Sequence, residues 1–167
     1  MTFAIAARTG LAGLALLAAL APAGVLAADA PAAPAAATAS ADAARAQALL
    51  KKAVAHYRVA KDRAFADFNQ QRDYVDRELY VYVVSSATGV MLASGGPSFA
   101  LVNRNVAELE DATGKAFFQE MFAKARADGS GSVEYLWLDP VDNKEERKVA
   151  YFQQVDDRII AVGYYKR

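Results

Sequence analysis

The fold is decided by a stretch near the C-terminus, residues 132–165, which reads SVEYLWLDPVDNKEERKVAYFQQVDDRIIAVGYY. It holds three runs rich in β-branched and aromatic residues, a composition that favours strands: Ser132–Leu138, Lys148–Val155 and Arg158–Tyr165. A polar segment that opens with Asp139-Pro140 joins the first two runs, and Asp156-Asp157 joins the last two. Connections this short require antiparallel neighbours. The stretch therefore predicts a three-stranded antiparallel meander.

A second strand pair and a helix are predicted upstream of the meander. Leu79–Ser85 (LYVYVVS) and Val90–Ala93 are strand-forming runs, and Ser86–Gly89 between them has turn chemistry, so the two form a hairpin. Apolar residues recur at helical spacing over Lys115–Ala127, and Asp128-Gly129 closes that pattern. This helix is expected to cross from the hairpin to the meander.

The longest amphipathic pattern runs from Ala43 to Gln70. Its apolar residues fall on one helical face, and most charges lie off that face. We expect one long helix with Asp42 as its N-cap and with Tyr57 and Phe68 buried against the sheet. The predicted fold class is therefore α+β: a PAS-like five-stranded antiparallel sheet with a long N-terminal helix and a helical crossover.

The N-terminus has the pattern of an exported protein. Arg8 is the only charge before Asp29, and the apolar run LAGLALLAALAPAGVLA that follows it leads into small residues typical of a cleavage site. We expect a signal peptide over residues 1–27, cleavage before Ala28 and a periplasmic location. The alternative is an uncleaved segment that anchors the protein in the inner membrane.

The mature chain is expected to contain a tether and one domain. Residues 28–43 are rich in Ala and Pro and hold no large apolar side chain, which favours a flexible tether. No internal repeat or second tether follows, so residues 44–167 form a single domain. Because no second apolar span follows either, we expect the domain to pass its signal to a membrane sensor or another periplasmic protein.

Composition excludes several function classes. The chain has 19 basic and 19 acidic residues and no basic run, which disfavours nucleic-acid binding. It has no cysteine, so a lipid anchor, disulfides and thiolate metal sites are excluded, and the single histidine, His56, cannot build a zinc site of His and Cys ligands. No nucleophile motif or phosphate loop is present, so we expect neither an enzyme nor a cofactor.

Eight short segments in order carry a resemblance to a known family. They are AFADFN (64–69), LYVYV (79–83), GVMLASG (89–95), LVNRN (101–105), DATGKAF (111–117), VEYLWLDP (133–140), KVAY (148–151) and IIAVGYYK (159–166). Through them the chain resembles the single Cache family, in its type-2 form, of bacterial extracytoplasmic sensing domains. The resemblance implies binding of a small molecule outside the cell, often a short carboxylate such as acetate, pyruvate or lactate.

Three positions depart from the pattern of that family. Ser94 stands where the family often has His, Gly131-Ser132 where it often has Gly-Trp, and Asp139 where it prefers Asn before Pro140. These departures leave open which ligand is bound and whether the pocket works.

Aromatic residues on the predicted strands are candidates for the ligand pocket. Strand alternation places Tyr135 and Trp137 on one face of their strand and Tyr80 and Tyr82 on one face of theirs. Rings with polar tips suit a small organic anion, although rings in a plain core would show the same pattern.

Lys148 is the candidate cation of the site. A carboxylate needs a cation or a group of N–H and O–H donors, because a bare buried anion is costly. Lys148 also matches a lysine that recurs in the resembled family, and Tyr151 follows three residues later, on the opposite side if strand pairing is regular. The alternative is a solvated hairpin lysine.

The other charged residues are expected to be solvated or structural. Arg104 and Lys115 are further cations without a predicted role, and His56 lies on the flank of the long helix. Glu108, Glu110 and Asp111 lack the spacing of a calcium loop, and the hairpin residues Asp139, Asp142 and Glu145 are expected to face solvent.

The sequence therefore predicts a stand-alone exported sensory module that binds a small organic ligand, a short carboxylate. The rival prediction is an accessory or structural partner protein with the same fold and no working pocket.

Overall fold

The computed structural model describes residues 34–70 and 72–166. The expected signal peptide and the first part of the expected tether lie outside the described residues. The elements, in chain order, are α1 (Pro34–Ala60), η1 (Lys61–Arg63), α2 (Ala64–Asn69), β1 (Val75–Asp76), β2 (Leu79–Ser85), β3 (Met91–Ser94), η2 (Pro97–Leu101), α3 (Phe117–Asp128), β4 (Ser130–Leu138), β5 (Glu145–Val155) and β6 (Arg158–Tyr165).

The strands form one antiparallel sheet in the order β1-β2-β6-β5-β4, and β3 pairs with the second half of β2. The predicted α+β, PAS-like class is confirmed, and so are the hairpin, the helical crossover and the meander. The sixth strand, β1, was not predicted. It has two residues, which is too short for an alternating pattern to be visible.

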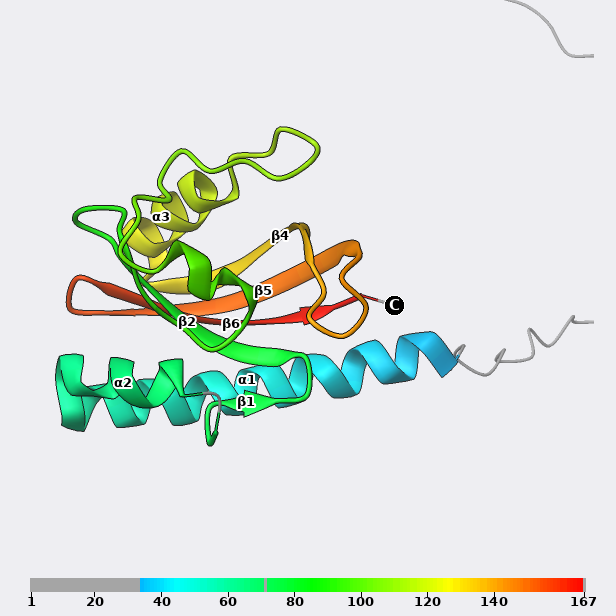
Figure 1. Cartoon of the computed structure of the whole chain (residues 1–167), viewed down its shortest axis with the longest axis horizontal. Helices are drawn as coiled ribbons and strands as arrows, with labels where there is room; N and C mark the ends of the chain where they lie inside the picture. The colour runs from blue at the N-terminus through cyan, green and yellow to red at the C-terminus, as the bar shows by residue number, and fades with distance from the viewer. Residues whose placement is uncertain (1–33, 71, 167) are drawn as a thin grey trace, which may run out of the picture. The chain divides into compact units, whose positions relative to one another are not determined.

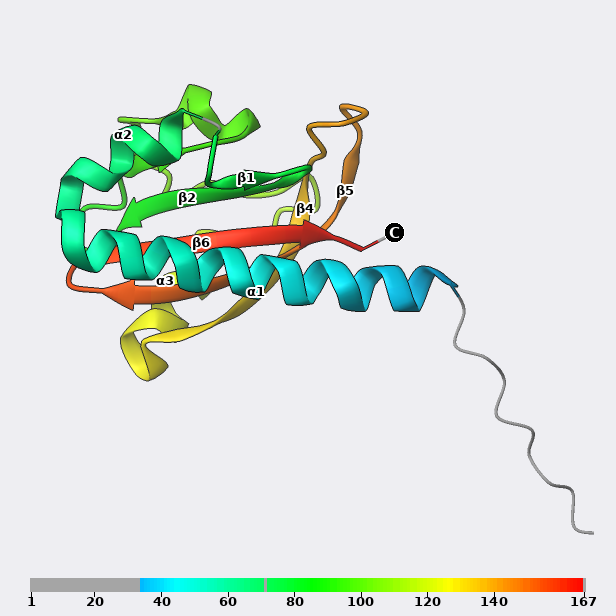
Figure 2. The ribbon, with the colours of Figure 1, turned by 90° about the horizontal axis from the view of Figure 1, so that it is seen from below.

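Helices cover both faces of the sheet (Figures 1 and 2). On one face α1 lies across β2, β6 and β5, and Tyr57 and Phe68 are buried there, as expected. On the other face α3 packs against β4 and β5, and the long segment between β3 and α3 lies over the sheet on the same side (Figure 1). Strands β2, β5 and β6 thus contribute alternate residues to two separate cores.

The N-terminal helix differs from the prediction at both ends. It begins at Pro34, so residues 34–43 are helical and not a flexible tether. Alanine has the highest helix propensity and proline is tolerated in a first turn, so an Ala-rich segment extends the helix readily. Asp42 is therefore not an N-cap; it lies inside the helix and accepts a hydrogen bond from Arg45 at 2.8 Å.

The single helix expected to run to Gln70 is interrupted near Lys61. That residue has a φ of 52°, in the left-handed region, and the chain passes through a 3-10 turn before α2 begins at Ala64. The interruption lets the aromatic residues of α2 pack back onto the sheet: Phe68 is fully buried and meets Tyr74 edge-on, with ring centroids 4.8 Å apart.

Candidate functional site

A lysine is buried on the α3 face of the sheet, where its partner on β6 is the last residue of that strand. Lys148 on β5 is 0% exposed, which is rare for a side chain that carries a charge in water. Its Nζ lies 3.8 Å from the centroid of the Tyr80 ring and 4.8 Å from that of Tyr165. It also donates a hydrogen bond to Tyr165 Oη at 3.3 Å. The amine thus sits in an aromatic cage.

Strand register and one glycine make room for this lysine. Lys148 pairs with Tyr135 on β4 and with Tyr165 on β6, so tyrosines flank it on both neighbouring strands. Gly163 lies two residues before Tyr165, on the same face. A Cβ atom at Gly163 would come within 2.2 Å of Lys148 Cε, so the aliphatic part of the lysine occupies the space that a side chain would fill.

Further aromatic rings, two of them with paired hydroxyl groups, lie on the same face of the sheet as the lysine. The Tyr82 and Tyr135 hydroxyls share a hydrogen bond of 3.2 Å, and the Tyr80 hydroxyl lies 3.4 Å from Ser98 Oγ. Tyr135 stacks on Phe117 with ring centroids 4.0 Å apart, and the half-buried Trp137 meets both rings edge-on. These phenols are donors that a buried anion could use.

Burial sets the protonation of this cluster. It lowers the pKa of the Lys148 ammonium below its ordinary value, and the phenol of Tyr80 and the carboxylate of Asp139 offset part of that effect. Burial also raises the pKa values of Tyr82, Tyr135 and Tyr165. The tyrosines therefore stay neutral donors at neutral pH, while Lys148 holds its proton less tightly than an exposed lysine.

The loop between β4 and β5 closes one end of the site. Asp139 opens the loop and is 0% exposed, so the prediction that it faces solvent is wrong. Its Oδ1 accepts a hydrogen bond from the Val141 N–H at 2.7 Å, and its own N–H donates to the Lys144 carbonyl at 2.8 Å. The Tyr165 hydroxyl donates to the Leu138 carbonyl at 2.7 Å and so ties this loop to the cage.

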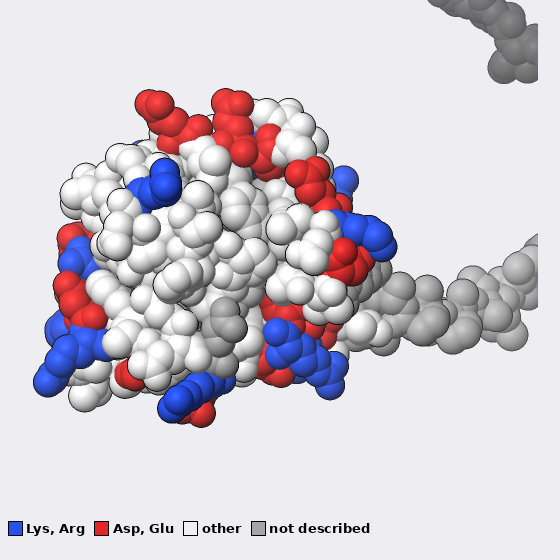
Figure 3. Space-filling model, in the orientation of Figure 1, with Lys and Arg blue, Asp and Glu red and all other residues white. Residues whose placement is uncertain are grey.

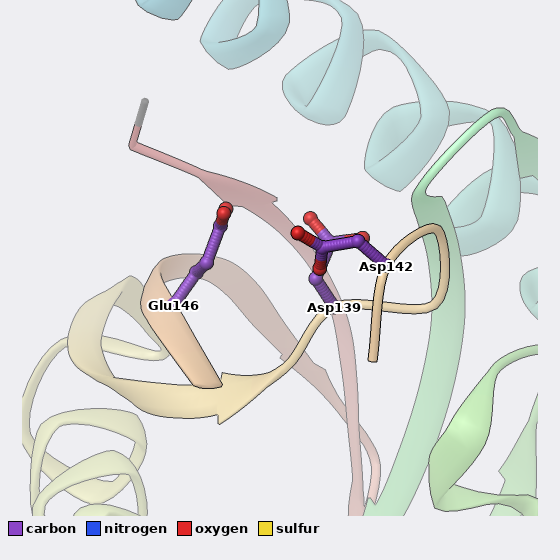
Figure 4. A group of neighbouring side chains, drawn as sticks. All are labelled: Asp139, Asp142 and Glu146. Carbon is purple, nitrogen blue, oxygen red and sulfur yellow. The ribbon is translucent and has the colours of Figure 1, made fainter. Parts of the chain in front are cut away.

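Two more carboxylates lie beside Asp139. Carboxylate oxygens of Asp139, Asp142 and Glu146 all lie within 4.8 Å of one another (Figure 4). Asp142 is also ion-paired with Lys144 at 2.9 Å. Three acidic side chains therefore meet in the loop at this end of the site.

An open cleft lies beside the site, on the outer side of Tyr80. It has a volume of about 350 Å³ and is lined by Val75, Arg77, Tyr80, Gly95, Gly96, Pro97, Pro140 and Asn143. The Tyr80 ring forms part of its wall and contacts Lys148 from the inner side. A Cβ atom at Gly96 would come within 2.5 Å of this ring, so the glycine lets the chain pass close over Tyr80.

Five of the six predicted site residues come together at this place: Tyr80, Tyr82, Tyr135, Trp137 and Lys148. The sixth, Tyr151, does not. It belongs to the α1 face and stacks on Tyr164 with ring centroids 5.9 Å apart. Three residues along a regular strand separate it from Lys148, and an odd offset places a side chain on the opposite face.

Two residues of the site were missed by the sequence analysis, Tyr165 and Asp139. Tyr165 contacts the lysine through the pairing of β5 with β6, which follows from the meander but was not used to search for neighbours. Asp139 was expected in solvent because a polar hairpin loop usually is. One sequence feature could have drawn attention to Asp139: it stands where the resembled family prefers Asn.

Other charged candidates have structural partners. Lys115 Nζ donates to the Glu134 carbonyl at 2.5 Å, and Asp111 Oδ2 accepts from the Leu136 N–H at 2.9 Å. These two side chains occupy a carbonyl and an N–H on the outer edge of β4. They therefore protect this edge strand from pairing with a further strand. His56 contacts Asp67 at 2.7 Å, and Arg104 is exposed.

On the face in Figure 3 most charged side chains lie around the rim, and the middle is predominantly uncharged. This face offers no basic patch for nucleic acid. Within residues 34–70 and 72–166, no helix has the length and apolar character needed to cross a membrane.

Comparison with known proteins gives one family and several similar folds. A family model described as Cache domain matches residues 38–165. A methyl-accepting chemotaxis protein of Vibrio parahaemolyticus has a similar structure, with a TM-score of 0.64 and 17% identity over 78% of this chain and 93% of that chain. A periplasmic sensor domain of a chemotaxis protein is similar with a TM-score of 0.59 and 24% identity, over 78% and 94%.

A third structure is described as the basis for carboxylic acid recognition by a Cache chemosensory domain. Its TM-score is 0.57 and its identity 23%, over 78% of this chain and 87% of that chain. No curated protein matches the chain. At these identities the solved structures establish a common fold.

Proposed function

The chain belongs to the Cache domain family, as the resemblance of its sequence implied, and on this premise we propose that it is a sensory module that binds a small organic carboxylate at Lys148. The ligand's carboxylate pairs with the lysine inside the aromatic cage, and the neighbouring phenols donate to its oxygens. The role is binding and not catalysis.

The burial of Lys148 carries this proposal. A buried ammonium loses its hydration and lowers the stability of the fold unless a partner compensates. An apolar residue at this position would pack without that loss. A ligand carboxylate would explain the buried lysine. It would pair with the ammonium group and accept the hydrogen bonds that water cannot accept in the buried site.

The fold neighbours support the ligand class. One of the similar structures is described by its recognition of carboxylic acids. Lys148 and the tyrosines offer a cation and O–H donors, which are the groups that a carboxylate requires.

We also propose that the protein works outside the cytoplasm and relays its bound state to a partner. The charge of Arg8 followed by an apolar run is the pattern of an export signal. The partner would be a membrane sensor or another periplasmic protein. A form held in the inner membrane by an uncleaved N-terminal segment is the alternative.

One observation favours the rival function, an accessory protein without a working pocket. Lys148 is fully enclosed, and the Tyr80 ring stands between it and the open cleft. A ligand can reach the lysine only if Tyr80 or the β4–β5 loop moves. A domain that never opens would keep the fold and act through its surface alone.

A ligand screen followed by calorimetry separates the two functions. Residues 34–167 are screened by thermal shift against short carboxylic acids, amino acids and amines, and each acid that stabilises the domain is titrated. Lys148→Met should weaken binding by about 30-fold or more, since loss of a buried charge partner costs about 2–5 kcal/mol.

Lys144→Met is the matched control, because its side chain is 75% exposed in the same hairpin and it should leave the affinity unchanged. A screen in which no acid binds would support the accessory role. Equal affinities of wild type and Lys148→Met would remove Lys148 from the site.

A further inference from the structure

We infer that Tyr80 is the gate of this site: its ring moves into the open cleft of about 350 Å³ and so opens a path from solvent to Lys148, and Ser98 holds the gate closed. The inference rests on the proposed function and names the route by which a ligand reaches the lysine. The alternative route is through the β4–β5 loop, residues 139–144.

The Tyr80 side chain separates the cleft from the lysine. Its ring forms part of the cleft wall, and Lys148 Nζ lies 3.8 Å from the ring centroid on the inner side. Tyr80 is 2% exposed and Lys148 0% exposed, so the ring in this position keeps water from the amine. Moving this one side chain toward the cleft would uncover the amine. The contact between ring and ammonium is lost on opening, and the carboxylate of a ligand would replace it.

The gate lies at an end of the sheet, where a side chain can move without breaking many strand pairs. Tyr80 is the second residue of β2. The chain that passes over it, Gly95-Gly96, covers the ring with main chain alone, since a Cβ atom at Gly96 would come within 2.5 Å of the ring. Two adjacent glycines between β3 and η2 also supply the backbone freedom that a hinge needs. The segment η2, which carries Ser98, can therefore lift from the ring.

The hydrogen bonds favour this route over the loop. The Tyr80 hydroxyl is held by one long contact, 3.4 Å from Ser98 Oγ, and a hydrogen bond of this length is weak. The β4–β5 loop is tied to β6 by the Tyr165 hydroxyl, which donates to the Leu138 carbonyl at 2.7 Å. The carboxylate and the N–H of Asp139 hold the loop together from within, at 2.7 and 2.8 Å. Moving the loop therefore breaks stronger hydrogen bonds than moving the ring.

Chemical labelling of Lys148 measures the opening of the gate without a ligand. The whole chain is treated with formaldehyde and a borane reductant, which methylate amines, and methylation of Lys148 is followed over time by mass spectrometry. Ser98→Ala removes the hydrogen bond that holds the gate closed and should raise the methylation rate of Lys148 by about two- to tenfold. Tyr80→Phe removes the same hydrogen bond from the other side, so it should give a similar rise, and the double variant should give no further rise.

Val141→Gly is the matched control for the loop route. Val141 is 68% exposed, and a glycine in its place makes the β4–β5 loop more flexible, so this variant should leave the methylation rate of Lys148 unchanged. Urea below the unfolding transition separates the opening of the gate from global unfolding. Local opening exposes little surface, so methylation through the gate should respond weakly to urea.

Binding kinetics give a second readout with any acid that the screen finds. Ser98 holds the gate and is not placed against the ligand. Ser98→Ala should therefore raise the association and dissociation rate constants by similar factors and leave the Kd within about twofold of the wild-type value.

Two results would overturn the inference. One is a methylation rate that Val141→Gly raises and Ser98→Ala does not, which would assign the route to the loop. The other is a Lys148 that stays unmethylated, or whose methylation follows global unfolding in urea, in wild type and variants alike. If acids from the screen bind at Lys148 in either case, only the inference fails. A screen in which no acid binds, together with a rise in Ser98→Ala, would instead reject the proposed function and leave the gate standing.

Discussion

The two faces of the sheet are built from the same strands but bury different chemistry. Toward α1, strand β2 presents Leu79, Val81 and Val83, which pack among aliphatic and aromatic groups. Toward α3, the same strand presents Tyr80 and Tyr82, whose hydroxyls need buried partners.

The lysine of the site lies on the second face. The α1 face gains stability from apolar burial, about 25 cal/mol per Å². The α3 face loses part of that gain to a buried amine and a buried carboxylate, Lys148 and Asp139. Polar groups that lower stability in a small domain are a mark of function, because folding alone would not favour them. The difference supports a stabilising role for the α1 face and the proposed binding role for the α3 face.

The largest loss of stability is expected from a substitution on the α1 face. Phe68 is fully buried against the sheet, so Phe68→Ala should lower the free energy of unfolding by about 3–5 kcal/mol through lost burial and a cavity. Urea denaturation measures it. Ligand affinity of the molecules that remain folded should not change, and a loss under about 1 kcal/mol would mean that this face is not the main core.

A smaller loss of stability is expected at Gly163 on the α3 face, where packing and ligand binding depend on the same lysine. Gly163→Ala places a methyl group where Lys148 Cε lies 2.2 Å away, and overpacking of this kind costs about 1–3 kcal/mol. Ligand binding should weaken as well, because the amine is displaced.

A double-mutant cycle isolates that contact. In a Lys148→Ala background the penalty of Gly163→Ala should largely disappear, since the colliding atoms are absent. A penalty that persists in this background would trace the effect to the backbone of β6 and not to the lysine.

The smallest effect is the pH dependence of stability. Burial lowers the pKa of Lys148 in the folded state, so between that value and the ordinary pKa near about 10.4 the unfolded chain binds more protons than the folded one. Stability must then rise with pH in that window, by at most about 1.4 kcal/mol per pH unit. The destabilisation by the buried ammonium is fully present below the pKa of Lys148 in the folded state. The difference between wild type and Lys148→Met, measured by urea denaturation from pH 7 to 10, should shrink as pH rises, and a constant difference would contradict the shifted pKa.

Most of the fold could be predicted from the sequence because it depends on local patterns. Alternation identified β2 and β6 with their observed ends, Leu79–Ser85 and Arg158–Tyr165. It also separated Tyr80 and Tyr82 from their apolar neighbours. The start of α1 was missed because an Ala-rich segment reads equally as a tether or as a helix.

The site was predicted less completely because it depends on neighbours across strands. The periodicity of one strand places Lys148 and Tyr151 on opposite faces, and both were candidates because periodicity alone does not say which face holds the site. Asp139 and Tyr165 meet the lysine only through the register of β4, β5 and β6. Their burial is a tertiary property that loop composition does not reveal.

The most direct test of this account is the free energy of unfolding of Lys148→Met against wild type, without ligand and at pH 7. Because the buried ammonium destabilises the α3 face and methionine would fill the same space, the variant is predicted to be as stable as wild type or more stable by about 1–4 kcal/mol, while it loses affinity for the acids that bind wild type. A variant that is clearly less stable than wild type would show that Lys148 supports the fold, and would contradict the assignment of the α3 face to binding.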